Sequence, residues 1–107
     1  MPKVGDVIAI YAQKDMDELL FVAEVVDQSD TKLHVHWWSA KKVDGTWSPQ
    51  FLAKKGKGHA GPYTNWIWKE GCLDVLNNLN GQKKGKIEPD QLGELLKIAQ
   101  AYKKEKQ

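Results

Sequence analysis

The stretch LHVHWWSAKKVDGTW, residues 33–47, decides how this chain of 107 residues is expected to fold. It begins with strict alternation, and successive side chains of a strand point to opposite faces of a sheet. The odd-numbered residues from Leu33 to Trp37 are therefore expected on one face, and the even-numbered residues from His34 to Trp38 on the other. Adjacent tryptophans cannot enter the same core, so the pattern predicts that Trp37 fills the core and Trp38 faces a surface that binds a ligand.

Segments on both sides of this stretch predict further strands, because their apolar residues alternate and many are β-branched or aromatic. Asp44-Gly45 is a strong hairpin signal, and Pro49 restricts the strand after it to an edge or an end. Residues 72–76 are compatible with either a short strand or a helical turn. Five short antiparallel strands favour a small barrel in a mainly β fold. The predicted strands are 7–12, 19–27, the strand of the opening stretch, 46–52 and 63–70.

The C-terminal part predicts an α-helix over residues 90–105. Asp90 suits the N-cap and follows Pro89, a residue common at the start of helices. Because a helix of this length is marginal alone, we expect it to pack on the barrel. The composition of residues 77–89 predicts a linker, so the chain is interpreted as a single domain with a barrel at 1–76. One apolar stripe follows helical spacing: Leu92, Leu95, Leu96, Ala99 and Tyr102.

Residues 4–38, VGDVIAIYAQKDMDELLFVAEVVDQSDTKLHVHWW, resemble the opening of the Tudor-type and chromo-barrel domains of the Royal family. They also share features with bromo-adjacent homology modules. These domains run from Gly-Asp through an apolar strand, an acidic loop and an aromatic strand with Ala-x-Val to a Val-x-Trp strand. The resemblance implies a Src-homology-3-like, Tudor-like barrel. The matching positions are Gly5-Asp6, Tyr11, the acidic residues at 15–18, Phe21, Ala23, Val25, Val35 and Trp37.

Tudor-type domains hold a methylated lysine or arginine between aromatic rings, through cation–π attraction. The resemblance implies a box of Tyr11, Phe21 and Trp38, with Asp15, Asp17 or Glu18 as its acidic wall. The expected function is a non-catalytic module that binds a peptide, such as a methylated histone tail, in the nucleus or another intracellular compartment. It would act as a monomer or as part of a larger protein. The residues alone leave a second interpretation open, in which Trp38 packs beneath the terminal helix. A bulge before Ser39 would also exchange the roles of Trp37 and Trp38.

The charge is distributed unevenly, although the net charge is only +2. Residues 31–69 hold seven lysines and one acidic residue, whereas residues 1–30 hold two lysines and seven acidic residues. This distribution supports an alternative function, weak non-specific nucleic-acid binding by a barrel attached to a DNA-handling protein. The chain has no arginine, the residue that usually contacts guanine in a bidentate manner, so sequence-specific reading is not expected. The lysines expected to contact the nucleic acid are Lys54, Lys55 and Lys57 of the segment 31–69, together with Lys83 and Lys84 further along the chain.

No catalytic residue, metal site or cofactor is expected. His34 and His36 share a strand face, but with His59 they supply fewer than the four ligands of a structural zinc site. Cys72 and His59 lack the surroundings of a nucleophilic pair. A single cysteine excludes an internal disulfide and fits a reducing compartment. No apolar stretch approaches the roughly 20 residues of a membrane-spanning helix.

Overall fold

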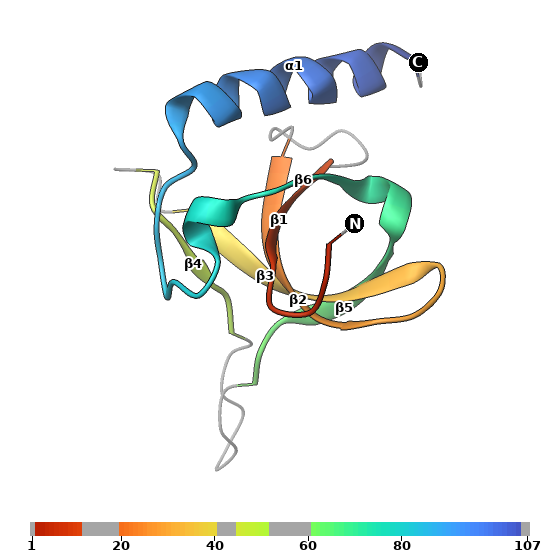
Figure 1. The fold of residues 1–107 in the computed structure, drawn as a ribbon, viewed down its shortest axis with the longest axis vertical. Coiled ribbons are helices and arrows are strands. Elements are labelled where there is room, and N and C mark those ends of the chain that lie inside the picture. Colours follow the sequence, from red (N-terminus) through yellow and green to blue (C-terminus); the bar gives the residue numbers. More distant parts are fainter. Residues whose placement is uncertain (1, 12–19, 41–44, 52–60, 106–107) are drawn as a thin grey trace.

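The protein is described by a computed structural model over residues 2–11, 20–40, 45–51 and 61–105. Within these residues six strands form one antiparallel sheet, and one α-helix follows them (Figure 1). No helix in this part of the chain is long and apolar enough to cross a membrane. The elements are β1 (Val7–Tyr11), β2 (Leu20–Gln28), β3 (Lys32–Ala40), β4 (Trp47–Pro49), β5 (Thr64–Trp68), η1 (Lys69–Gly71), β6 (Cys72–Val75), η2 (Asn77–Leu79) and α1 (Pro89–Glu105).

The strands follow the order β4-β3-β2-β1-β6, and β5 also pairs with β3. β5 pairs with residues 32–36 of β3, and β4 pairs with residues 38–40 further along the same strand. Residues 72–75, which the sequence left open between strand and helical turn, form β6 and pair with β1. The sheet therefore has six strands within the described residues rather than the five expected.

Apolar residues cover both faces of the sheet, and alternation along each strand divides them into two clusters. The strand cluster comes from the strands alone, whereas the helix cluster joins the opposite face to the chain beyond residue 75. In β1, for example, Ile8 and Ile10 belong to the strand cluster and Val7 and Ala9 to the helix cluster. The strand cluster consists of Ile8, Ile10, Ala23, Val25, Leu33 and Val35. The helix cluster consists of Val7, Ala9, Leu20, Val22, Trp38, Leu76, Leu79, Ile87, Leu95 and Ala99.

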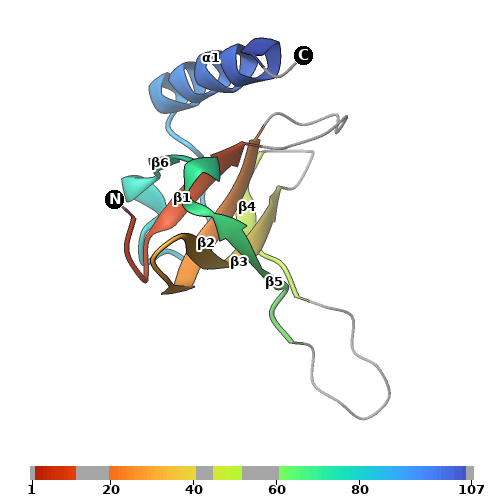
Figure 2. The same ribbon diagram turned by 90° about the vertical axis from the view of Figure 1, so that its right-hand side faces the viewer.

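The predicted helix is confirmed as α1, which lies across one side of the sheet, against β2 and β6 (Figures 1 and 2). Leu95 and Ala99 of its apolar stripe are buried, and Leu92 packs against their cluster. Leu96 is 36% exposed, so the stripe is narrower than predicted. The side chain of Tyr102 falls outside the described part of the chain. Burial of this stripe explains how a helix of marginal intrinsic stability is held.

The segment 77–89, expected to be a linker from its composition, packs against the sheet. Leu79 and Ile87 are buried in the helix cluster. The backbone of Gly85 pairs with that of Trp47 through two hydrogen bonds of 2.8 and 2.9 Å. The burial of Leu79 and Ile87, which removes their apolar surface from water, holds the segment 77–89 against the sheet although most of its residues are polar.

The Gly5-Asp6 pair forms the turn that starts the sheet. Gly5 has a φ of 97°, a left-handed conformation that favours glycine. The Asp6 carboxylate is buried, and its oxygens accept hydrogen bonds from the backbone N–H of Lys3 and from the Asn80 amide. Asn80 Oδ1 in turn accepts the Val7 N–H at 2.6 Å. The first turn of the chain is therefore tied to the end of η2.

Candidate functional site: an aromatic cleft

The adjacent tryptophans of β3 lie on opposite faces, as alternation predicted, but their burial is the reverse of what was expected. Trp38 is 3% exposed and belongs to the helix cluster with Leu95 and Ala99. Trp37 is half-buried and packs against the strand cluster. The assignment of Trp37 to the core and Trp38 to the surface is wrong, because residues beyond 75 cover the face of β3 that was expected to meet water. The second interpretation, with Trp38 beneath the helix, agrees with this packing.

A cavity of about 410 Å³ opens where β3, β4 and the start of β5 meet. Its volume falls in the range of ligand-binding pockets, roughly 300–1,000 Å³. We call it the aromatic cleft, because five of its lining residues are aromatic. The lining consists of Phe21, Trp37, Trp38, Trp47 and Tyr63, together with Ser39, Ala40, Gln50 and Asn65.

Trp37 occupies the centre of this arrangement and is held from several sides. Its indole N–H donates to Asn65 Oδ1 at 2.8 Å, and Phe21 meets its ring edge-on with centroids 5.7 Å apart. Its backbone N–H donates to the Tyr63 carbonyl, and its carbonyl accepts from Gln50 N–H. The ring is therefore pre-positioned, which lowers the conformational entropy that a ligand would have to remove.

Trp38 forms another wall of the cleft from within the helix cluster. Its indole Nε1 is buried and has no hydrogen-bond partner among the residues that the structure describes. A buried, unpaired donor costs about 1–3 kcal/mol. The ring therefore contributes to the core and to the cleft wall through its size and flat shape rather than through its N–H.

A second cavity of about 320 Å³ shares two of its lining residues, Phe21 and Trp37, with the cleft. The three rings expected in one box are thus divided between two cavities: Trp38 lines the cleft, Tyr11 lines the second cavity, and Phe21 lines both. Asp15, Asp17 and Glu18, the residues expected to supply the acidic wall, lie outside the described residues. The second cavity is lined by Ile10, Tyr11, Phe21, Trp37, Trp66, Ile67, Trp68 and Gly71.

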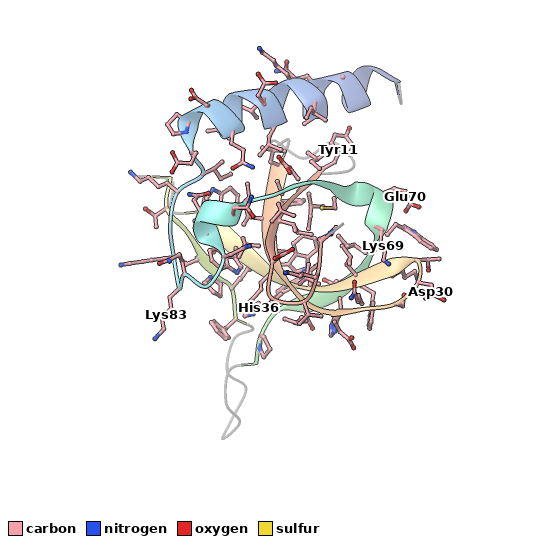
Figure 3. The ribbon with its side chains drawn as sticks, viewed as in Figure 1. Tyr11, Asp30, His36, Lys69, Glu70 and Lys83 are labelled. Atoms are coloured by element: carbon pink, nitrogen blue, oxygen red, sulfur yellow. The ribbon has the colours of Figure 1, made fainter. Side chains whose placement is uncertain are left out.

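The lysines of the nucleic-acid alternative are only partly described. Lys54, Lys55 and Lys57 lie outside the described ranges, whereas Lys83 and Lys84 are exposed. Figure 3 places Lys83 on the opposite side of the molecule from Lys69 of η1.

The histidines of β3 are engaged with neighbouring groups. His34 stacks on Trp66, with ring centroids 4.7 Å apart, and His36 Nε2 lies 2.8 Å from the Gln50 carbonyl oxygen. His59, the third histidine considered as a ligand in the zinc site that the sequence argued against, is not among the described residues. In the part of the chain that is described, no group of three His, Cys, Asp or Glu side chains could hold a metal ion.

Cys72 packs against the strand cluster at the start of β6. Burial, with a smaller effect from the Asp74 carboxylate, raises the pKa of its thiol to about 11. The thiolate is the nucleophilic form of cysteine, and a raised pKa keeps its population low near neutral pH. Cys72 is therefore unsuited to nucleophilic catalysis.

Comparisons with known proteins do not assign the chain to a family. No family model, curated protein or solved structure matches it. The aromatic cleft is therefore the basis on which a function can be proposed.

Trp47 and Tyr63 wall the cleft but were not among the predicted site residues. The hairpin signal Asp44-Gly45 could have indicated that Trp47 lies beside the strand of Trp37 and Trp38. A two-residue turn at this position would pair residue 42 with Trp47. The observed partner is Ala40, a shift of two residues that leaves the ring on the same face. Tyr63 gave no comparable signal, since it reaches the cleft through the bridge between Phe51 and Pro62, a tertiary pairing.

Proposed function

We propose that this chain is a non-catalytic interaction module that binds a peptide in the aromatic cleft, with a methylated lysine side chain as the anchor. The observation that supports this most directly is the gathering of five aromatic residues around one cavity of about 410 Å³. A cation over an aromatic face gains about 0.5–2 kcal/mol per contact, and more rings around it add contacts and exclude water. A histone tail is the candidate peptide that the resemblance of residues 4–38 implies.

The polarity of the cleft favours a fully methylated cation. Its described lining includes no carboxylate, and its polar members are Ser39, Gln50 and Asn65. An unmodified ammonium group brings three N–H donors that would lose water on entering an aromatic cavity. A trimethylammonium group has no N–H and so needs no acceptor. The polar residues are suited to hydrogen bonds with the backbone of the peptide.

The proposal includes closure of the sheet into a Tudor-like barrel. β5 pairs with β3 and β6 pairs with β1, and only the three residues of η1 separate β5 from β6. Ile67 of β5 and Val75 of β6 also pack against the same strand cluster. A short connection between strands that pair with distant parts of the sheet supports the Src-homology-3-like closure that the resemblance implies.

Calorimetric titration with two peptides of the same sequence, one trimethylated on lysine and one unmodified, tests the function. The trimethylated peptide is expected to bind more tightly. Trp47→Ala removes a ring from the cleft and should weaken its binding about 2- to 30-fold. Trp68→Ala is the matched control, because Trp68 does not line the cleft, and it should leave the Kd of the peptide unchanged.

Equal affinity for the two peptides would contradict the proposal, as would a Trp47→Ala variant that is folded and binds as tightly as the unchanged protein. Thermal unfolding of each variant shows whether the domain remains folded.

A further inference from the structure

Three exposed aromatic residues stand outside the aromatic cleft on the face formed by β3 and β5. Trp68, Trp66 and Phe51 are 58%, 47% and 56% exposed, although large aromatic side chains are usually covered in a small domain. Phe51 meets His36 of β3 edge-on, with ring centroids 5.1 Å apart. Figures 1 and 2 both show β5 on the side of the molecule away from α1, so the helix does not cover this face.

The two tryptophans are each supported by the residue directly opposite on β3. Lys32 pairs with Trp68, and its Nζ lies 4.4 Å from the centroid of the indole ring. His34 pairs with Trp66 and stacks on it with an interplanar angle of 11°. Each ring is thus held against a neighbour on one side while about half of the residue stays accessible. Rings held in this way lose little freedom when a ligand stacks on them.

The supporting residues occupy every second position of β3, at 32, 34 and 36. Alternate residues of a strand are about 6.5–7 Å apart along its axis, so the row has a regular spacing. A regular row of flat, accessible rings suits a polymer that repeats a flat group. Single-stranded nucleic acid is such a polymer, since every base has a π-face that stacks on aromatic side chains regardless of sequence.

The charge of this part of the chain favours a polyanion. Residues 31–69, which include β3, β4 and β5, hold seven lysines and one acidic residue. Of these seven lysines the structure describes Lys32, which lies opposite Trp68, and Lys69, which directly follows Trp68. Lysine binds phosphate as a point charge, which provides affinity without sequence preference.

We propose that the β3–β5 face binds single-stranded nucleic acid, with bases stacked on Trp66 and Trp68 and with Lys32 at the phosphates. This site is separate from the aromatic cleft, because none of Trp66, Trp68 and Phe51 lines the cleft. Asp30 and Glu70 lie on the same side of the molecule as Lys69 (Figure 3). Their carboxylates would repel the phosphates of a nucleic acid that lies near Lys69. Neutralising these two carboxylates should therefore tighten binding.

Fluorescence anisotropy with three labelled probes of equal length tests the proposal. The probes are an oligothymidylate of roughly 12 nucleotides, within the range that small single-strand-binding domains cover, an abasic strand, and a duplex. The single strand should bind most tightly. The abasic strand keeps the phosphates but lacks bases, and the duplex keeps its bases stacked inside, so both should bind more weakly.

Substitutions separate stacking from charge. Trp66→Leu and Trp68→Leu should each weaken binding of the oligothymidylate about 5- to 150-fold, whereas Trp66→Phe keeps a π-face and should retain most of the affinity. Lys32→Gln should reduce the slope of log K against log salt by about 0.7. The double variant Asp30→Asn, Glu70→Gln should tighten binding. Trp47→Ala removes a ring that lines the cleft and packs against the helix cluster but lies outside this face, so a folded variant should keep the same affinity for this probe.

Equal affinity for the abasic strand and the oligothymidylate would overturn the proposal. So would unchanged binding by Trp66→Leu and Trp68→Leu variants whose melting temperatures are normal. Tighter binding of an uncharged proline-rich peptide than of the oligothymidylate, lost in the same variants, would assign the row of rings to protein recognition instead.

Discussion

Trp38 combines two tasks, since one ring fills part of the helix cluster and also walls the aromatic cleft. Trp37, its neighbour, has a different environment: it is half-buried and fixed by Asn65 and Phe21. At the scale of single residues, the free energy of unfolding should therefore respond differently to the same substitution at these adjacent positions.

Trp38→Ala should lower the free energy of unfolding by about 3–5 kcal/mol, because it leaves a large void among buried residues. Trp38→Phe should cost clearly less, since it keeps an aromatic ring and removes an N–H that has no partner in the described residues. Trp37→Ala should cost less than Trp38→Ala, because part of its ring is already in contact with water. Urea denaturation of the three variants measures these differences. A larger loss for Trp37→Ala than for Trp38→Ala would contradict this assignment of the core.

Cys72 should react slowly with alkylating reagents. Burial raises the pKa of its thiol to about 11, above the unperturbed cysteine value of about 8.5. The rate of reaction with iodoacetamide, followed against pH, should therefore rise with a midpoint near the raised pKa rather than near that of free cysteine.

The folded state holds the thiol proton of Cys72 more tightly than the unfolded state does. The contribution of this group to the free energy of unfolding should therefore be fully present below about pH 8.5 and be lost as the pH rises towards 11. Cys72→Ser should remove that part of the pH dependence, and an alkylation midpoint like that of free cysteine would contradict the burial of the thiol.

At the scale of elements, α1 and the segment before it make up one side of the helix cluster. Gln91 ties the first turn of α1 to β6, where its amide donates to Asp74 Oδ2 at 3.2 Å and to the Val75 carbonyl at 3.0 Å. Leu95 and Ala99 continue the contact into the apolar cluster. The helix is thus part of the packed domain, and its faces differ sharply in exposure.

Leu95→Ala should cost about 2–5 kcal/mol, because Leu95 is 1% exposed and its removal leaves a cavity. Ile98→Ala is the matched control on the same helix, since Ile98 is 41% exposed and should change stability by roughly 0.5 kcal/mol or less. Thermal or urea unfolding of both variants compares the two faces. Similar small effects at both positions would mean that α1 does not pack on the sheet in solution.

Two glycines should respond in opposite directions to alanine. A Cβ on Gly85 would lie 2.5 Å from Leu79 Cδ2, so the buried leucine would have to move, and Gly85→Ala should cost about 1–3 kcal/mol. Gly93 lies within α1 and has open space at its Cβ, so Gly93→Ala should stabilise the protein by about 0.5–1 kcal/mol. Differential scanning calorimetry of the two variants measures both shifts. A stabilising Gly85→Ala would show that the segment 77–89 does not pack as described.

At the scale of the whole molecule, the position of α1 determines which faces are available for binding. It covers one side of the sheet, and β5 lies on the side away from it (Figure 2). No described residue of α1 is among those that line the aromatic cleft, and Trp66 and Trp68 belong to β5, so the helix leaves both surfaces open. The two proposed ligands, a peptide and a single-stranded nucleic acid, use different residues of these surfaces.

The local structure of this protein was predictable from its sequence. The alternation in residues 7–12, 19–27 and 33–38 predicted strands, and the helical spacing of Leu92, Leu95 and Ala99 predicted α1; the structure confirms both. These patterns are readable because each depends on neighbours within a few positions, where the geometry of a strand or helix is nearly fixed. The division of Trp37 and Trp38 between two faces follows from the same geometry.

Only the tertiary structure decided which of the two faces is covered and where a cavity remains. Trp38 is buried by residues that lie some 40 to 60 positions later in the chain, such as Leu79, Leu95 and Ala99. The cleft likewise combines residues from four separate segments, 21, 37–40, 47–50 and 63–65. A period of two assigns a side chain to a face but contains no information on what packs against that face, because burial is a property of the folded chain as a whole.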